Sequence, residues 1–278
     1  MERLNQKFKF GDRTRLYDIY LPDNWDKKSA VIYLHGGGGN PTIHRRQSRI
    51  VDAANKYGFA AVGLHGTGSL PGVLTWNAGT CCGYAHDNQV DDVGFINAFI
   101  GFLIRQGYVV EGRIFLMGFS NGAAMCYRAL QAPNHKIAAI CAISGTAQVP
   151  LAYWTRPVPV LHVHGLLDAH APAAGGIGDD AVSKVVHQPV LSVMTQVAGL
   201  NGGLTHGDEQ LEAAVESGPG RVELWYDLPR YARVSTTLLT TGGHTYPGGV
   251  DVRDGKDGPV ADYDVNAVAW KFFSEVTS

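Results

Sequence analysis

The sequence has no excess of either charge. Its 278 residues hold 23 lysines and arginines against 25 aspartates and glutamates, which gives a formal net charge of −2, and no basic stripe runs along it. Domains that bind nucleic acid concentrate lysine and arginine on one face. We therefore expect no nucleic-acid partner.

Long apolar runs are also missing. A membrane-spanning helix needs about 18 or more apolar residues in a row. The longest candidate, 95–104, is interrupted by Asn97 and Gly101, so we expect a buried helix there and no membrane association. The N-terminus lacks the apolar core of a signal peptide. We therefore expect either the cytoplasm, or the cell exterior with the leader already removed, as the compartment.

Cysteine is scarce, and no two cysteines have the CxxC spacing of a metal site. The four are Cys81, Cys82, Cys126 and Cys141. A bridge between neighbouring cysteines is strained and rare. Cys126 and Cys141 lie in apolar surroundings, where a thiol behaves as a small core residue. The cysteines therefore indicate neither a metal nor a compartment.

Apolar residues make up 45% of the chain, enough for a sizeable core. Short unbroken apolar runs alternate with helical stretches, as in a parallel sheet that is covered on both faces. The predicted strands are 31–34, 59–64, 114–119, 137–143, 158–163, 222–226 and 234–240, after an edge hairpin of 8–10 with 16–21. The predicted helices are 42–57, 87–106, 121–132 and a C-terminal one over 265–273. This succession predicts an α/β fold with a mostly parallel central sheet and helices on both faces, in one domain over 1–278.

The stretch 171–220 differs from the rest, because it is rich in Gly, Ala and Asp and has no clear strand. Two interpretations are equally consistent with this composition. It is a largely helical insertion over the site, or it is an ordinary crossover connection.

The strongest motif is GFSNG, residues 118–122, between the apolar run 114–117 and good helix sequence. A strand, a sharp turn and a helix are the context of a nucleophile elbow, in which the turn lifts the serine hydroxyl above the sheet. The following helix points its first N–H groups at the site, where negative charge develops. Ser120 is therefore the predicted nucleophile, and the alternative is a plain strand-to-helix turn.

A second motif, HGGGG at residues 35–39, directly follows a predicted strand. Acyl transfer passes through an oxyanion that needs N–H donors. We expect the backbone N–H groups of Asn121 and Gly37 to supply them, with Gly36 or Gly38 as alternatives to Gly37. A phosphate loop does not fit, because the GK[ST] ending is missing.

Asp168 follows the predicted strand 158–163 and is the expected acid of a triad. A carboxylate in the loop after a strand end can orient a histidine across the top of the sheet. The competing acids are weaker candidates. Asp87, Asp91 and Asp92 lie at a predicted helix start, where acids favour the dipole, and Asp179 and Asp180 lie in a glycine-rich loop with no strand before them.

His162 and His164 form an H-x-H pair on the same predicted strand. Two imidazoles on one strand face are an arrangement that binds metals. No third ligand has a diagnostic spacing, so we expect no metal and no cofactor. The alternative is that His164 shapes the loop that presents Asp168.

His244 lies in a glycine-flanked loop after the last predicted strand. It gives the order Ser120, Asp168, His244, which is the order of α/β-hydrolase triads. His35, His65 and His86 precede the serine and would break that order. His244 is therefore the expected general base.

Taken together, these motifs resemble one family. HGGGGN, WNAGTCCG, the segment 91–96, GFSNG, HGLLD and GGHTYPG match polyhydroxybutyrate-depolymerase-like esterases, a group that overlaps the feruloyl and acetyl-xylan esterases of carbohydrate esterase family one. The resemblance covers about residues 10–275. It implies an α/β-hydrolase fold and a cofactor-free esterase with Ser120, Asp168 and His244 as the triad. The sequence departs from the family at Leu64-His65-Gly66, where members often have Pro-Asp-Gly.

The activity expected from this resemblance is hydrolysis of feruloyl or acetyl esters of plant-type carbohydrates, with a small-molecule or oligosaccharide ester as partner. One alternative is a hydrolase of polyhydroxybutyrate-type oligomers, and another is a non-catalytic binding protein that keeps the fold. Trp76 and Tyr246 are candidates to stack on the substrate, and the alternative for both is core packing. The sequence leaves the oligomeric state open.

Overall fold

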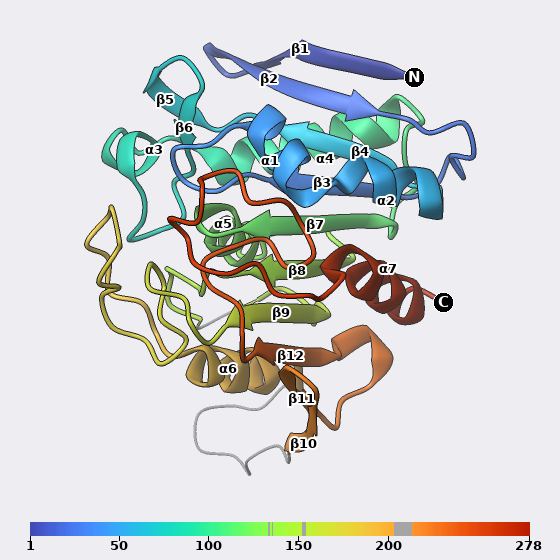
Figure 1. The fold of residues 1–278 in the computed structure, drawn as a ribbon. Helices are drawn as coiled ribbons and strands as arrows, with labels where there is room; N and C mark the ends of the chain where they lie inside the picture. The colour runs from blue at the N-terminus through green and yellow to red at the C-terminus, as the bar shows by residue number, and fades with distance from the viewer. Residues whose placement is uncertain (133, 135, 152–153, 203–212) are drawn as a thin grey trace.

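The computed structural model describes residues 1–278 except 133, 135, 152–153 and 203–212 (Figure 1). The strands are β1 (Glu2–Phe10), β2 (Arg13–Tyr20), β3 (Ala30–Leu34), β4 (Ala60–Leu64), β5 (Thr67–Leu70), β6 (Val73–Thr75), β7 (Ile114–Phe119), β8 (Ala139–Ile143), β9 (Val160–Gly165), β10 (Ala213–Gly218), β11 (Arg221–Tyr226) and β12 (Val234–Leu239). The helices are α1 (Pro41–Ser48), α2 (Ile50–Tyr57), α3 (Gly83–Asp87), α4 (Asp92–Arg105), α5 (Asn121–Ala129), α6 (Val190–Gly202) and α7 (Val265–Val276), with a short 3₁₀ turn at Arg230–Ala232.

One ten-stranded sheet has the order β1-β2-β4-β3-β7-β8-β9-β12-β11-β10. Its central strands, from β4 to β12, pair in parallel, while β1, β2, β10 and β11 are antiparallel at the two edges. The parallel strands end on the same side of the sheet, at the left in Figure 1. Loops that follow them therefore meet at that edge, where ligands bind in open α/β sheets.

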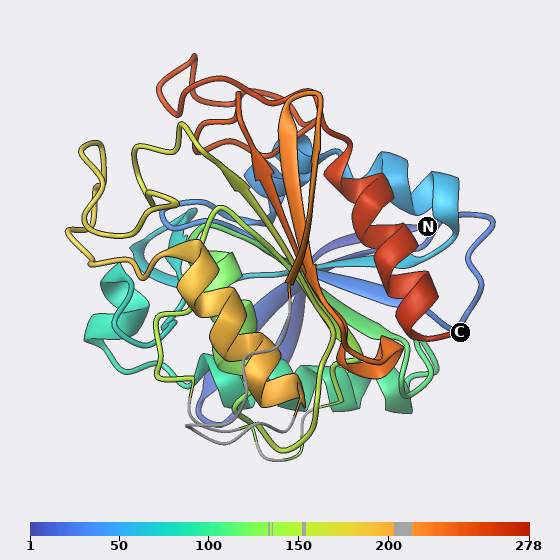
Figure 2. The same ribbon diagram turned by 90° about the horizontal axis from the view of Figure 1, so that it is seen from below.

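The sheet lies between two layers of helices (Figure 2). Helices α4, α5 and α6 pack on one face and share a buried apolar cluster with it. Helices α2 and α7 pack on the opposite face over a second cluster, in which Phe115 and Phe273 stack at 4.5 Å. Strands β3, β4, β7, β8 and β9 are buried along their whole length, which is why they read as unbroken apolar runs. The predicted α/β class with a mostly parallel sheet is confirmed.

Two of the four predicted helices differ from the observed ones in more than the position of their last residue. The helix predicted over 42–57 is two helices, because Arg49 between them has a left-handed backbone, with φ of 55°. Asn40 caps the start of helix α1, because its side chain accepts a hydrogen bond from the N–H of Ile43. Helix α4 begins later than predicted, because Asp91 caps it by accepting from the N–H of Gly94.

The segment 171–220 contains features of both interpretations. Its described part holds a loop, helix α6, which connects β9 to the sheet's far edge, and strand β10. The expectation of no strand there is wrong, because β10 pairs antiparallel with β11. Residues 181–187 of this loop line part of a cleft.

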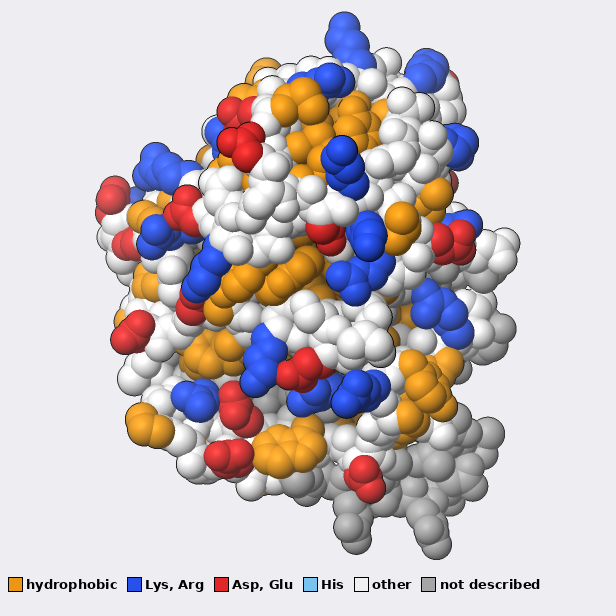
Figure 3. Space-filling view, turned by 90° about the vertical axis from the view of Figure 1, so that its right-hand side faces the viewer, with side chains coloured by type: hydrophobic (Ala, Val, Ile, Leu, Met, Phe, Trp, Pro, Cys, Tyr) orange, Lys and Arg blue, Asp and Glu red, His pale blue; other side chains and the backbone are white. Residues whose placement is uncertain are grey.

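The face at the right of Figure 1 carries mixed charges. Acidic and basic side chains are interspersed there with apolar ones (Figure 3).

Among the described residues, the helices are all too short or too polar to span a bilayer.

Candidate active site

Ser120 sits at the turn between β7 and α5, as the sequence predicted. Its φ of 55° lies in the left-handed region, which is rare for a residue with a side chain. Its backbone N–H donates to the carbonyl of Ile143 on β8 at 2.8 Å. The surrounding sheet therefore stabilises a conformation that serine alone disfavours, and strained backbone of this kind gathers at functional sites.

The glycines on either side of Ser120 allow a close backbone approach. A Cβ at Gly118 would lie 2.2 Å from the carbonyl oxygen of Gly122, and a Cβ at Gly122 would lie 2.2 Å from that of Leu34. Both distances are far shorter than van der Waals contact. The sharp turn therefore requires glycine at both positions.

The structure brings Ser120, His244 and Asp168 together from three separate loops. Nε2 of His244 lies 2.9 Å from Oγ of Ser120, and Nδ1 of His244 lies 2.7 Å from Oδ2 of Asp168. Both distances are within hydrogen-bonding range. The ring of His244 lies between Phe119 at 5.1 Å and His170 at 4.8 Å, measured between centroids. Both neighbouring rings thus pack against the imidazole.

Asp168 is almost completely buried and accepts several hydrogen bonds. Its Oδ1 accepts from the backbone N–H groups of His170 and Ala171 at 2.9 and 2.7 Å. Burial opposes ionisation, but the contacts with His164 and His244 outweigh it and hold the pKa of Asp168 below its usual range. The carboxylate is therefore charged at neutral pH and favours the Nδ1–H tautomer of His244.

The predicted oxyanion donors lie next to each other. An ideal Cβ on Gly37 would be 3.5 Å from Cβ of Asn121. Within the described residues, the N–H groups of Gly37 and Asn121 make no backbone hydrogen bond, whereas the N–H of Gly38 donates to the carbonyl of Leu74 at 2.8 Å. This bond removes Gly38 as an alternative, while the N–H groups of Gly36, Gly37 and Asn121 remain available to a ligand.

His35 holds the glycine loop, a role that was not predicted from the sequence. Its Nδ1 bonds the carbonyl of Gly36 at 2.8 Å and its Nε2 accepts from the N–H of Gly66 at 3.1 Å. Burial lowers the pKa of His35 to about 4, so the ring is neutral and can act as donor and acceptor at once. The signal in the sequence for this role was the position of His35 directly before the glycines of the motif.

The two aromatic residues predicted to stack on the substrate are packed in the interior instead. Trp76 is fully buried and its indole N–H donates to the carbonyl of His35 at 3.0 Å. Tyr246 is also buried, and its hydroxyl donates to Oδ1 of Asn266 at 2.8 Å. Both polar groups find partners inside the protein, as buried Trp and Tyr usually do. The prediction of substrate contact is therefore wrong for both.

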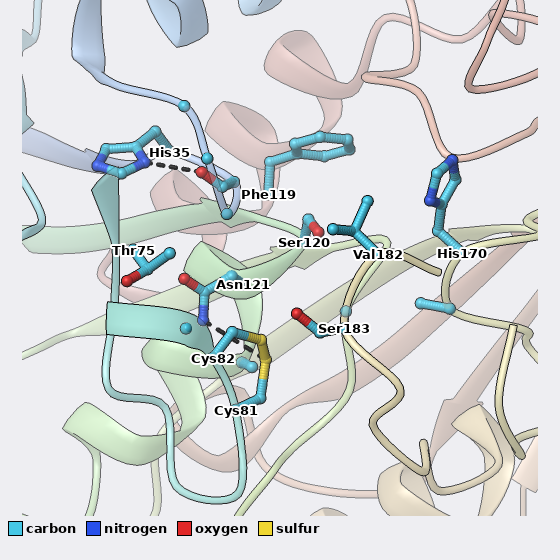
Figure 4. A pocket seen from close by; sticks show the side chains of 18 of the residues that line it. His35, Thr75, Cys81, Cys82, Phe119, Ser120, Asn121, His170, Val182 and Ser183 are labelled. Carbon is cyan, nitrogen blue, oxygen red and sulfur yellow. Dashed lines mark hydrogen bonds between the residues drawn. A yellow bond between two sulfur atoms is a disulfide. The ribbon is translucent and has the colours of Figure 1, made fainter. Parts of the chain in front are cut away.

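A cleft of about 640 Å³ opens over Ser120. Its wall combines the glycine loop, the start of α1, the β5–β6 hairpin, the loop after β8 and the loop 181–187. Figure 4 shows Ser120 between His170 on one side and Cys81, Cys82 and Asn121 on the other. Most of these wall residues were not predicted, because outside the motifs they carry no pattern of their own in the sequence.

Cys81 and Cys82 line this cleft and are joined by a disulfide (Figure 4). Bridges between neighbouring cysteines are rare, so this pairing was not expected from the sequence. Cys126 and Cys141 are free thiols in the core. Burial raises the pKa of both thiols above the ordinary value, so they behave as the apolar residues that the sequence indicated.

The H-x-H pair lies behind the site, in the sheet. Nε2 of His162 lies 3.1 Å from Nδ1 of His164. Across the described ranges, no three metal-ligating side chains gather as a metal site would require. The ring nitrogens of both histidines are occupied by hydrogen bonds within the protein.

Comparisons with known proteins show which family the chain belongs to. Residues 22–195 match the family model described as Phospholipase/Carboxylesterase. The putative esterase NocK of Nocardia uniformis subsp. tsuyamanensis is 26% identical over 252 residues, which cover 85% of this chain and 72% of that protein. The probable feruloyl esterase C of Aspergillus clavatus is 27% identical over 167 residues, which cover 59% of this chain and 58% of that protein.

Among solved structures, an acetyl xylan esterase from Aspergillus awamori superposes with a TM-score of 0.62 at 17% identity, covering 91% of this chain and 96% of that one. At this identity the likeness concerns the fold alone, and it confirms the predicted α/β-hydrolase fold. The predicted resemblance to feruloyl and acetyl-xylan esterases is also confirmed by these relatives. The chain belongs to the Phospholipase/Carboxylesterase family of α/β-hydrolases.

Proposed function

We propose that this protein is a serine carboxylic ester hydrolase in which Ser120, His244 and Asp168 act as a catalytic triad. The observation that carries the proposal is the continuous hydrogen-bonded line from Oγ of Ser120 through His244 to Asp168, at 2.9 and 2.7 Å, at the floor of an open cleft. A nucleophile, a base and an orienting acid within hydrogen-bonding reach are the signature of an activated serine.

The reaction has two steps. His244 takes the proton of Ser120 as Oγ attacks the ester carbonyl, and the backbone N–H groups of Gly37 and Asn121 stabilise the oxyanion. The tetrahedral intermediate collapses, His244 gives the proton to the leaving alcohol, and an acyl-enzyme remains. Water, deprotonated by His244, then attacks the acyl carbon. The second tetrahedral intermediate releases the acid while His244 returns the proton to Oγ of Ser120.

The substrates that we propose are feruloyl or acetyl esters of carbohydrates. Support comes from the names of the relatives, which include a feruloyl esterase and an acetyl xylan esterase. The cleft also has both apolar and polar walls. Phe119, Ile43 and Val182 contribute apolar surface, while Gln148 and His187 contribute polar groups. An aromatic acyl group with oxygen substituents suits such a mixed wall.

The test compares the wild type with Ser120→Ala on p-nitrophenyl acetate, methyl ferulate and a hydroxybutyrate trimer. Ser192→Ala is the matched control, because Ser192 is exposed on α6 and does not line the cleft. We expect wild type and control to cleave the acetate and the ferulate, and Ser120→Ala to lose on the order of 10⁶ in turnover.

The other outcomes are equally informative. Cleavage of the trimer but not of the ferulate would replace the substrate proposal with hydroxyalkanoate oligomers. A folded wild type that cleaves none of the three esters would contradict the esterase proposal and favour a binding protein that keeps the fold.

A further inference from the structure

A line of buried polar side chains continues from Asp168 into the sheet, away from the cleft. Nε2 of His164 lies 3.4 Å from Oδ2 of Asp168 and 2.7 Å from the carbonyl oxygen of Ala171. Nδ1 of His164 lies 3.1 Å from Nε2 of His162, and Nδ1 of His162 lies 2.8 Å from the hydroxyl of Tyr127 on α5. All of these side chains are buried.

Such a line is unusual in this part of the molecule. Strand β9 pairs in parallel on both sides and is buried along its length, a setting that normally holds apolar side chains. His162 and His164 are two residues apart, so they project from the same face of the strand, and their rings stack at 5.3 Å. Buried polar groups are costly unless each has a partner, and here each ring nitrogen has one.

The hydrogen atoms in this line can be assigned from one fixed end. A carbonyl oxygen only accepts, so Nε2 of His164 carries the proton that is donated to Ala171. When His164 carries this single proton, its Nδ1 accepts, which requires a proton on Nε2 of His162. Nδ1 of His162 accepts in turn, so the hydroxyl of Tyr127 donates to it. That hydroxyl also lies 3.5 Å from Sδ of Met194, a weaker acceptor than an imidazole nitrogen.

Every donor in the line therefore points along it from Tyr127 toward the Asp168 end, where the last one donates to the carbonyl of Ala171. Burial and the neighbouring His164 hold the pKa of His162 well below its usual range, in agreement with a neutral ring. The last N–H of the line lies against the same carboxylate oxygen that accepts from His244. Its bond to Ala171 also fixes the turn whose N–H groups donate to the other carboxylate oxygen.

We propose that His162 and His164, anchored by Tyr127, are positioning residues that hold the Asp168 carboxylate in the orientation that His244 requires. The proposal rests on the proposed role of Asp168 in the triad. Neither histidine lines the cleft, so they act through Asp168 and His244 and not on the substrate. Their loss should lower kcat and leave KM unchanged.

The kinetic test compares His164→Leu with His164→Gln. Gln keeps an N–H donor in the region of Nε2, whereas Leu removes it. We expect His164→Leu to lower kcat on the order of 10²-fold, the loss typical of a misplaced catalytic group, while His164→Gln stays within about tenfold of the wild type. Equal losses in both variants, or a loss that appears in KM alone, would overturn the proposal.

Thr236→Val provides the matched control. Thr236 lies opposite His162 on the neighbouring strand β12 and is equally buried, but it is not part of the line. Its substitution should leave kcat unchanged. A comparable loss of kcat in Thr236→Val would mean that any change in this part of the sheet disturbs the site, and it would contradict a specific role for the histidines.

A second measurement needs neither activity nor a folded variant. Nitrogen-15 NMR of the histidine-labelled wild type distinguishes the two tautomers of a neutral imidazole. We expect His162 and His164 both to carry the proton on Nε2 at neutral pH. A proton on Nδ1 of either ring would overturn the assigned direction of the line. A wild type without esterase activity would contradict the proposed function, while the tautomers would still decide whether the line exists as described.

Discussion

Trp76 and Asn121 are joined by a pair of hydrogen bonds across 45 residues of sequence. The backbone N–H of Trp76 donates to Oδ1 of Asn121 at 2.7 Å, and Nδ2 of Asn121 donates to the carbonyl of Trp76 at 3.0 Å. The amide side chain thereby ties Trp76, which directly follows the cleft residue Thr75, to the first residue of α5, whose backbone N–H is the proposed oxyanion donor. Trp76 thus contributes to the site through its backbone, while its ring packs in the core.

Asn121→Ala should cost both stability and turnover. It removes the partner of the buried N–H of Trp76, and an unsatisfied buried donor costs about 1–3 kcal/mol. It also removes both hydrogen bonds that hold the start of α5 to Trp76. We therefore expect kcat to fall by about 10- to 10²-fold, the upper figure being the loss that follows removal of an oxyanion donor. Urea unfolding and initial rates on p-nitrophenyl acetate measure the two effects separately.

Asn201→Ala is the control for this variant. Asn201 makes the same pair of bonds with the backbone of Val158, at 3.1 and 2.6 Å, at a place that does not line the cleft. It should lose a similar free energy of unfolding and keep its kcat. Equal losses of kcat in the two variants would mean that general loosening, and not the position of the oxyanion donor, explains the effect.

Asp168→Asn tests the acid of the proposed triad. An amide at this position leaves the shape unchanged but presents an N–H to His244 in place of an acceptor, which favours the wrong tautomer. We expect kcat to fall on the order of 10⁴-fold with little change in KM. Asp180→Asn, on an exposed side chain of a loop whose acids were candidates in the sequence, should behave as the wild type. A loss in Asp180→Asn and none in Asp168→Asn would reverse the assignment.

The positions of Ser120, Asp168 and His244 at strand ends and the mostly parallel sheet were accessible from the sequence because each depends on local signals. An apolar run followed by GFSNG, HGLLD or GGHTYPG indicates a strand end with a special turn, and parallel strands bring such ends to one edge. The cleft wall was not accessible in this way. It is made by the hairpin at Thr67–Leu70 and Val73–Thr75 and by loop residues 181–187, whose positions depend on contacts far apart in the chain.

The contacts of Asp92 were also not accessible from the sequence. From the sequence, its place at a helix start was attributed to the helix dipole alone, but in the structure it also pairs with the buried Arg15 of β2 at 2.8 Å. Its second oxygen accepts from the N–H of Asn77, beside Trp76. The sequence indicated the helix but placed its start too early, and nothing local in it indicated an ion pair across 77 residues.

Gly122→Ala tests whether the turn at Ser120 requires a residue without a Cβ at this position. The added Cβ would lie 2.2 Å from the carbonyl oxygen of Leu34, so β3 and α5 would have to separate, at a cost of about 3 kcal/mol or more. Gly199→Ala in helix α6 is the control, because an added Cβ there meets no atom within 4 Å. It should stabilise the protein by about 0.5–1 kcal/mol. Changes of the same sign in the two variants would contradict the close-approach argument.

His44→Phe tests how a buried histidine couples stability to pH. His44 is buried and stacks on the ring of Tyr33 at 5.4 Å, and neither of its ring nitrogens has a hydrogen-bond partner among the described residues. Burial lowers its pKa from 6.5 to about 3. Below pH 6.5 the unfolded chain therefore binds a proton that the folded chain does not bind, and the free energy of unfolding falls as the pH falls.

The slope contributed by one such group is about 1.4 kcal/mol per pH unit. His44→Phe removes this contribution while keeping an aromatic ring on Tyr33, so its free energy of unfolding should fall less steeply between pH 6 and pH 4 than that of the wild type. At pH 8 the variant should be at least as stable, because two unpaired buried nitrogens are gone. Urea unfolding at pH 4, 5, 6 and 8 measures both effects. Parallel curves for variant and wild type would show that His44 is protonated in the folded protein over this range.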